Sequence, residues 1–120
     1  MVVIKKFENT IPIDFGDFEL RFVASDENLQ NLVKLSEKAD KAEETFKNLK
    51  GTIDDLKSIL EFTKELWIEL FDEETFIKIY EYCNKSTIPT FIACIQTIRG
   101  LAVEIPNLVN ENTLTKYLSN

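Results

Sequence analysis

The sequence predicts an α+β, mainly α fold: a short N-terminal β-hairpin followed by a compact bundle of three to five helices. Two patterns carry this prediction. Polar and apolar residues alternate near the N-terminus, as in a half-buried strand, and farther on apolar residues recur in steps of three and four. The 120 residues suit a single domain, with a hairpin region at 1–24, a helical bundle at 25–105 and a loosely ordered tail at 106–120.

The hairpin is predicted from two short runs around a turn. Glu19–Val23 alternates polar and apolar side chains, and Thr10–Phe15 is a β-branched and aromatic run. The turn between them contains Gly16, which is free to take a positive φ. Pro12 cannot donate to a strand ladder, so we expect its strand at a sheet edge. A third strand at Val2–Phe7 is also considered.

Two helices are predicted to follow as an antiparallel pair. The first begins at Ser25, whose hydroxyl can cap it, and ends at Gly51. Its apolar residues form an a/d seam: Leu32, Leu35, Ala39, Ala42, Phe46 and Leu49. The second helix begins at Thr52, with Asp55 in a capping-box position, and is apolar on more than one face. The first seam is expected to pack within the domain; the alternative is an interface with another molecule.

The rest of the chain predicts two more helices and a tail. Three acids at 72–74 suit the positive end of a third helix. Pro89 fits the first turn of a fourth helix, which we expect to run to about Val103 and to be ended by Pro106. Residues 107–120 predict a weakly held tail with one or two helical turns.

The apolar segments indicate a protein of the cytoplasm. The run Val2–Ile4 precedes two lysines, which reverses the order of a secretory signal. The longest apolar stretch, Ile88–Leu101, is interrupted by polar residues and is shorter than the roughly eighteen residues of a spanning helix, so no membrane partner is expected. In a reducing compartment Cys83 and Cys94 are expected to be small apolar side chains rather than a disulfide or half of a metal site.

Composition excludes several classes of function. The chain has no histidine, which removes Ser-His-Asp and Cys-His catalysis and most catalytic zinc sites. Its 14 basic and 21 acidic residues give a net charge of −7, which disfavours nucleic acid as a partner. The carboxylates at 54–55 and 72–74 lie at predicted helix starts, where acids are common without any catalytic role. We therefore expect no enzymatic activity, no cofactor and no metal.

Acidic and aromatic residues coincide in one part of the chain. Residues 54–81 hold nine acids against three lysines, a net charge of −6. An acidic surface bordering aromatic side chains suits a basic, amphipathic partner segment; the alternative is that the aromatics are buried and the acids merely solvated. The candidate partner-binding residues are Phe62, Trp67, Phe71, Phe76 and Tyr80.

The order of these segments resembles the tail assembly chaperones of long-tailed bacteriophages, particularly those of Gram-positive hosts. The resemblance covers roughly residues 10–105 and rests on three places: the strand pair ending in Phe18–Phe22 that runs into a charged helix at Asn28–Leu32, the stretch Leu66–Tyr80, and the closing apolar helix Phe91–Leu101. Such relatives often have Gly where this chain has Asp72.

The resemblance implies a non-enzymatic protein of the bacterial host cytoplasm that is absent from the mature virion. Such chaperones bind the tape measure protein and keep it soluble during tail morphogenesis, and in many phages a frameshifted longer form recruits the tail tube protein. Two other functions are considered: a structural or homo-oligomeric adaptor that uses the Leu32–Leu49 seam, and a small acidic inhibitor.

Overall fold

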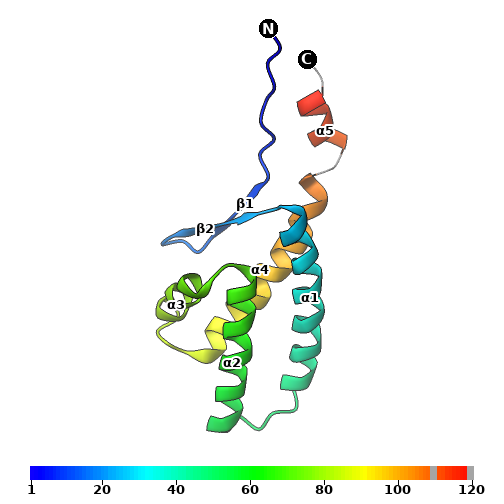
Figure 1. The fold of residues 1–120 in the computed structure, drawn as a ribbon. Helices are drawn as coiled ribbons and strands as arrows, with labels where there is room; N and C mark the ends of the chain where they lie inside the picture. Colours follow the sequence, from blue (N-terminus) through cyan, green and yellow to red (C-terminus); the bar gives the residue numbers. More distant parts are fainter. Residues whose placement is uncertain (109–110, 119–120) are drawn as a thin grey trace.

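The structure is a computed structural model that describes residues 1–108 and 111–118. These residues form one β-hairpin followed by five helices (Figure 1). The elements are β1 (Thr10–Asp14), β2 (Glu19–Val23), α1 (Asp26–Phe46), α2 (Ile53–Leu70), α3 (Glu73–Tyr82), α4 (Thr87–Leu108) and α5 (Glu111–Leu118). The predicted α+β, mainly α fold class is confirmed.

The hairpin has the predicted strands and turn. β1 and β2 pair antiparallel with Pro12 opposite Arg21, and Gly16 in the turn has a φ of +89°. The amide of Ala24 donates to the carbonyl of Asn9 at 2.8 Å. Because bonded and non-bonded pairs alternate along an antiparallel ladder, the backbone of Pro12 faces away from β2. Its missing N–H therefore costs no ladder bond, and the predicted edge position is confirmed.

The third strand considered at Val2–Phe7 does not form, since residues 1–9 have no regular secondary structure. This segment precedes β1 and continues its direction. To extend the hairpin ladder it would need β2 to continue past Val23, but the chain begins α1 at Asp26 instead. Residues 1–7, which we call the N-terminal arm, project from the hairpin away from α2 and α3 (Figure 1).

The predicted helix starts are formed by local caps. The hydroxyl of Ser25 accepts the amide of Asn28 at 3.2 Å at the start of α1. Thr52 and Asp55 exchange hydrogen bonds in a complete capping box at the start of α2. In each case the cap supplies an acceptor for amides that the first helical turn leaves without a partner.

The first helix ends at Phe46, earlier than the predicted end at Gly51. After Phe46 the amides of Asn48 and Leu49 bond to carbonyls three residues back, which tightens the chain into a turn. Gly51 then adopts a φ of +76° just before α2 begins. A reversal between two antiparallel helices needs several residues, and a single glycine does not provide them.

Helix α4 extends farther than predicted. Pro89 lies in its first turn as expected, but Pro106 is inside the helix, which ends at Leu108. Ile105 and Leu108 pack against the core together with buried Leu101, and these three residues share one helix face. That packing favours a continuous helix, and Pro106 removes one backbone donor close to the helix end.

By length and composition alone, α4 is long and apolar enough to cross a membrane. This corrects the expectation that the apolar stretch is too short, because the helix has 22 residues once it continues through Pro106. In this structure α4 packs against β1, α1, α2 and α3. A core helix of a bundle also meets such a criterion of length and composition.

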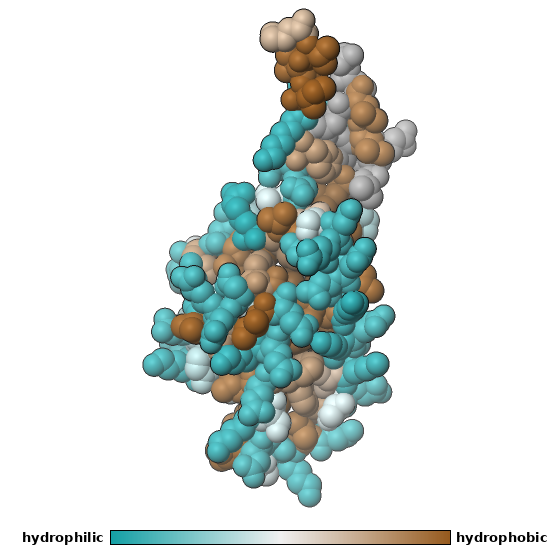
Figure 2. Space-filling model, in the orientation of Figure 1, coloured by the Kyte–Doolittle hydropathy of each residue, from teal (hydrophilic) through white to brown (hydrophobic). Residues whose placement is uncertain are grey.

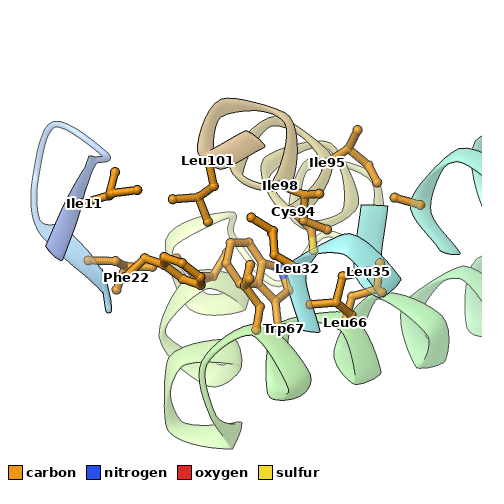
Figure 3. Close-up of a cluster of buried hydrophobic side chains, with 14 of the residues drawn as sticks. Ile11, Phe22, Leu32, Leu35, Leu66, Trp67, Cys94, Ile95, Ile98 and Leu101 are labelled. Carbon is orange, nitrogen blue, oxygen red and sulfur yellow. The ribbon is translucent and has the colours of Figure 1, made fainter. Parts of the chain in front are cut away.

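One hydrophobic core joins the hairpin to α1–α4. Trp67 is fully buried at its centre, and side chains from both strands, α1, α2 and α4 surround it (Figure 3). The surrounding residues include Ile11, Phe22, Leu32, Leu35, Leu66, Cys94, Ile98 and Leu101. The first four residues of the α1 seam are buried, so the seam packs within the domain.

The molecule is elongated, with principal extents of 64 × 27 × 21 Å and a radius of gyration of 17.2 Å. A compact chain of this length has a radius of about 14 Å. The N-terminal arm and α5 extend from the same end of the helical body (Figure 1), and they account for the additional length.

Candidate functional site: apolar surface on an acidic body

The five candidate partner-binding residues separate into core and surface positions. Trp67 and Phe76 are buried, whereas Phe62, Phe71 and Tyr80 are half-buried. The indole Nε1 of Trp67 donates to a backbone carbonyl of α4 at 3.2 Å, so this ring is fixed inside the core. Trp67 and Phe76 are therefore core residues in this structure, and partner binding by the five candidates stays a prediction.

Four of these residues lie at the corner between α2 and α3. The rings of Trp67 and Phe71 stack at a centroid distance of 6.2 Å, and those of Phe76 and Tyr80 stack at 5.7 Å. The Lys64 ammonium lies 5.8 Å from the centroid of Phe76. In both pairs a half-buried ring covers a buried one, so Phe71 and Tyr80 form the accessible rim of this corner.

Phe62 lies elsewhere, in a hollow between α1 and α2. The ring of Phe46 meets Phe62 edge-on at 5.6 Å and Phe91 at 5.5 Å. The hollow has a volume of about 350 Å³ and a mostly apolar lining. Its lining residues, which define the α1–α2 hollow, are Lys38, Lys41, Ala42, Thr45, Phe46 and Phe62. The small side chain of Ala42 leaves this space unfilled at the point where the two helices face one another.

The rim of the α1–α2 hollow is basic, in contrast to the chain as a whole. Lys38 forms an ion pair with Glu69 at 3.3 Å, and Lys41 is exposed beside it. Most acids of residues 54–81 are exposed on α2 and α3. Two lysines therefore belong to the lining of the hollow, and Lys38 is already paired with an acid of α2.

The structure also brings together an aromatic cluster that sequence reasoning missed. The rings of Phe15 and Phe18 stack at 4.9 Å, and Tyr82 meets both of them edge-on. The hydroxyl of Tyr82 donates to the carbonyl of Phe15 at 2.8 Å, and the Lys78 ammonium lies 4.4 Å from the centroid of Phe18. The cluster fixes the hairpin turn to the end of α3. In the sequence, the only indication of this cluster is the pair of phenylalanines that flank the hairpin turn.

Large apolar side chains are exposed at several places in the described part of the chain. Figure 2 shows apolar residues at the end where the arm projects, above a body dominated by hydrophilic residues. On the arm and α4 the exposed residues are Met1, Val2, Val3, Ile4, Phe7, Ile88, Ile92 and Val103. A net charge of −7 is of a size that favours solubility in a small domain.

The titratable groups show shifts with structural causes. Hydrogen bonds from Thr75 lower the pKa of the Asp72 carboxyl, which caps α3. The Thr10 hydroxyl lowers the pKa of Glu8, and burial raises the pKa of the Cys94 thiol to about 12. Within residues 1–108 and 111–118, no three Cys, Asp or Glu side chains gather as a metal site would require.

Comparisons with protein-family models, with curated proteins and with solved structures gave no match. The resemblance to phage tail assembly chaperones therefore stays a prediction from the residues. The physical features that bear on function are the α1–α2 hollow, the half-buried rings at the α2–α3 corner and the projecting arm.

Proposed function

We propose that the chain is a non-enzymatic phage tail assembly chaperone. It binds the tape measure protein in the cytoplasm of the bacterial host and keeps that protein soluble during tail morphogenesis. The observation that supports this proposal most is the combination of an apolar hollow with a strongly acidic body. The resemblance of residues 10–105 supplies the identity of the client.

A chaperone that holds a client in solution needs two physical properties. It needs an apolar surface to cover the client's own apolar surface, and it needs enough net charge to keep the complex dissolved. The α1–α2 hollow provides the first property, and the exposed acids of residues 54–81 contribute to the second.

The α1–α2 hollow suits one face of an amphipathic client helix. Such a helix places a large apolar side chain between Phe46 and Phe62, in the manner of other helix-in-groove complexes. Lys38 and Lys41 at the rim favour client segments that carry an acid beside the apolar residue. The sequence favoured a basic client segment. For the α1–α2 hollow, the proposal instead specifies an apolar client segment flanked by acids.

The proposal includes the tail tube protein as a second partner, recruited through a frameshifted longer form. Helix α5 lies at the end of the molecule opposite the loop that joins α1 to α2 (Figure 1). An extension beyond α5 would therefore leave the α1–α2 hollow open to the client. Nucleic acid and membranes have no part in the proposal.

The test is affinity capture from host cells that produce the phage, read by mass spectrometry. We expect the tagged chain to recover a very long helical protein of the same phage, and Lys41→Glu to reduce that recovery. Lys34→Glu is the matched control, because it makes the same charge change at an exposed site on α1 outside the α1–α2 hollow. Equal loss with both variants, or no long tail protein with the unaltered chain, contradicts the proposal.

A second candidate, a self-associating adaptor, has one observation in its favour. The first four residues of the α1 seam are buried within the domain, as expected, so a self-association surface would lie elsewhere. The N-terminal arm, however, presents apolar residues well away from the core, and a second copy of the chain could cover them. An oligomer that forms readily and binds no tail protein would favour this function.

A further inference from the structure

We propose that the N-terminal arm of one copy adds as a third strand to the outer edge of β2 in a second copy. The chain then self-associates by exchanging strands. This inference does not depend on the identity of the client, because it rests on the arm and the hairpin.

The first four residues of the arm are apolar and exposed in the single chain. Met1, Val2, Val3 and Ile4 are 74–114% exposed, although β-branched residues favour strands packed against a neighbour. Figure 2 shows this apolar end standing clear of the hydrophilic body. A contiguous exposed apolar segment of this kind marks an interaction site.

The two edges of the hairpin are unequal as acceptors. On the outer edge of β1, Pro12 has no amide to donate, and α4 residues Gly100 and Glu104 line a hollow beside it. On the outer edge of β2, Arg21 stands opposite Pro12 and keeps its amide. A partner strand therefore finds an uninterrupted row of donors only along β2.

The ladder geometry identifies which groups that outer edge offers. Because Ala24 bonds to Asn9 and bonded pairs alternate, the backbones of Glu19, Arg21 and Val23 face outward. The Asn28 side-chain amide donates to the Val23 carbonyl at 2.8 Å, which closes one end of the row. Within the described residues, the other outward groups have no hydrogen-bond partner.

Charge favours the body of a second copy over pairing between two arms. Residues 1–7 carry two lysines and no acid, whereas residues 8–120 hold 12 basic and 21 acidic residues, a net charge of −9. Around β2, residues 14–27 contain five acids against Arg21. Two arms paired with each other would place lysines opposite lysines, which is unfavourable.

Length and direction agree with exchange between copies. A strand rises about 3.3 Å per residue, so the six residues Val2–Phe7 span about 20 Å and match the five residues of β2. The arm of the same chain would have to reverse around the open end of the hairpin to reach that edge, but it points away from it (Figure 1). A second copy receives the arm without any such reversal.

The test combines sedimentation velocity with hydrogen exchange on the full chain, from micromolar to millimolar concentration. We expect concentration-dependent association, with the amides of Glu19 and Arg21 becoming protected as the oligomer forms. Ile4→Pro introduces a residue without an amide into the arm, and Arg21→Pro removes an outward amide from the acceptor edge. Each should raise the dissociation constant about tenfold or more, whereas Ile4→Val should leave it nearly unchanged.

Electrostatics gives an independent readout. Lys5→Glu combined with Lys6→Glu should weaken association, and added salt should weaken the unaltered oligomer. Three results would overturn the proposal: a monomer at every concentration, an oligomer insensitive to Ile4→Pro, or protection of the Arg21 amide that does not depend on concentration. The last result would show that the arm folds back on its own chain.

Discussion

The indole Nε1 of Trp67 donates a hydrogen bond to the backbone carbonyl of Thr90 at 3.2 Å, and both residues are fully buried. The bond joins the last turn of α2 to the first turn of α4. It provides the partner that a buried indole N–H requires, and it holds the ring at the centre of the core (Figure 3).

Trp67→Phe tests this central position. The substitution removes the indole N–H and leaves a cavity, so we expect the free energy of unfolding to fall by about 2–4 kcal/mol. Urea unfolding followed by circular dichroism measures the change. Ile68→Ala, at the partly exposed next residue of α2, should cost less than about 1 kcal/mol. Equal losses for the two variants would place Trp67 outside the core.

Thr63 is a buried residue whose hydroxyl has no hydrogen-bond partner among the described residues. Thr63→Val removes the unpaired hydroxyl at nearly the same volume, so the free energy of unfolding should rise by about 1 kcal/mol. Thr97→Val is the matched control, because the hydroxyl of buried Thr97 donates to the Ala93 carbonyl at 2.8 Å. Thr97→Val should not raise the free energy of unfolding measured by chemical denaturation. An equal rise in both variants would show that the unpaired hydroxyl of Thr63 is not the cause.

Asp72 makes the start of α3 sensitive to acid. Its carboxylate accepts the Thr75 amide at 2.7 Å, and the Thr75 bonds lower its pKa below the usual 3.8. A lowered folded-state pKa contributes stability above the unfolded pKa, and this contribution is lost as the pH falls through the folded pKa. Asp72→Asn keeps a capping side chain that does not titrate. It should therefore remove this part of the acid sensitivity, which falls between about pH 5 and about pH 2.

The cap itself is tested at neutral pH. Asp72→Ala should lower the free energy of unfolding by about 1 kcal/mol, while Asp72→Asn should lower it much less. Unfolding in urea at pH 7 and at low pH separates the two effects. If the free energy of unfolding of Asp72→Asn depends on pH as strongly as that of the unaltered chain, other carboxylates cause the acid sensitivity.

The two thiols should differ in reactivity. Burial raises the pKa of Cys94 to about 12, so almost none of it is thiolate at pH 8, whereas Cys83 is half-buried at the end of α3. In the folded Cys83→Ser variant we expect a disulfide reagent to leave Cys94 unmodified until denaturant is added. Rapid modification of Cys94 in native buffer would contradict its burial.

The starts of the helices were predictable because each depends on a few adjacent residues. Ser25, Thr52 and Asp72 cap helices where their side chains reach the next free amides. The ends were less predictable, since they depend on tertiary contacts. Helix α1 stops at Phe46 to allow the reversal before Gly51, and α4 continues through Pro106 because Ile105 and Leu108 pack on the core.

The candidate site was predictable only in part. Phe62 and Trp67 are five residues apart, which separates them by about 140° around a helix, so one enters the α1–α2 hollow and the other enters the core. Which face would be covered depended on where α4 packs, and local sequence does not encode that. The aromatic cluster of Phe15, Phe18 and Tyr82 joins segments more than 60 residues apart; the bond from Tyr82 to Phe15 spans 67 positions.

The most direct test of the proposed function is the solubility of the tape measure protein. The long tail protein is expressed alone, with this chain, and with its Ala42→Leu variant, which fills the α1–α2 hollow with a larger side chain. We predict that the chain keeps the tail protein soluble and copurifies with it, and that Ala42→Leu reduces both effects while remaining folded. A tail protein that is equally insoluble with and without the chain would contradict the account.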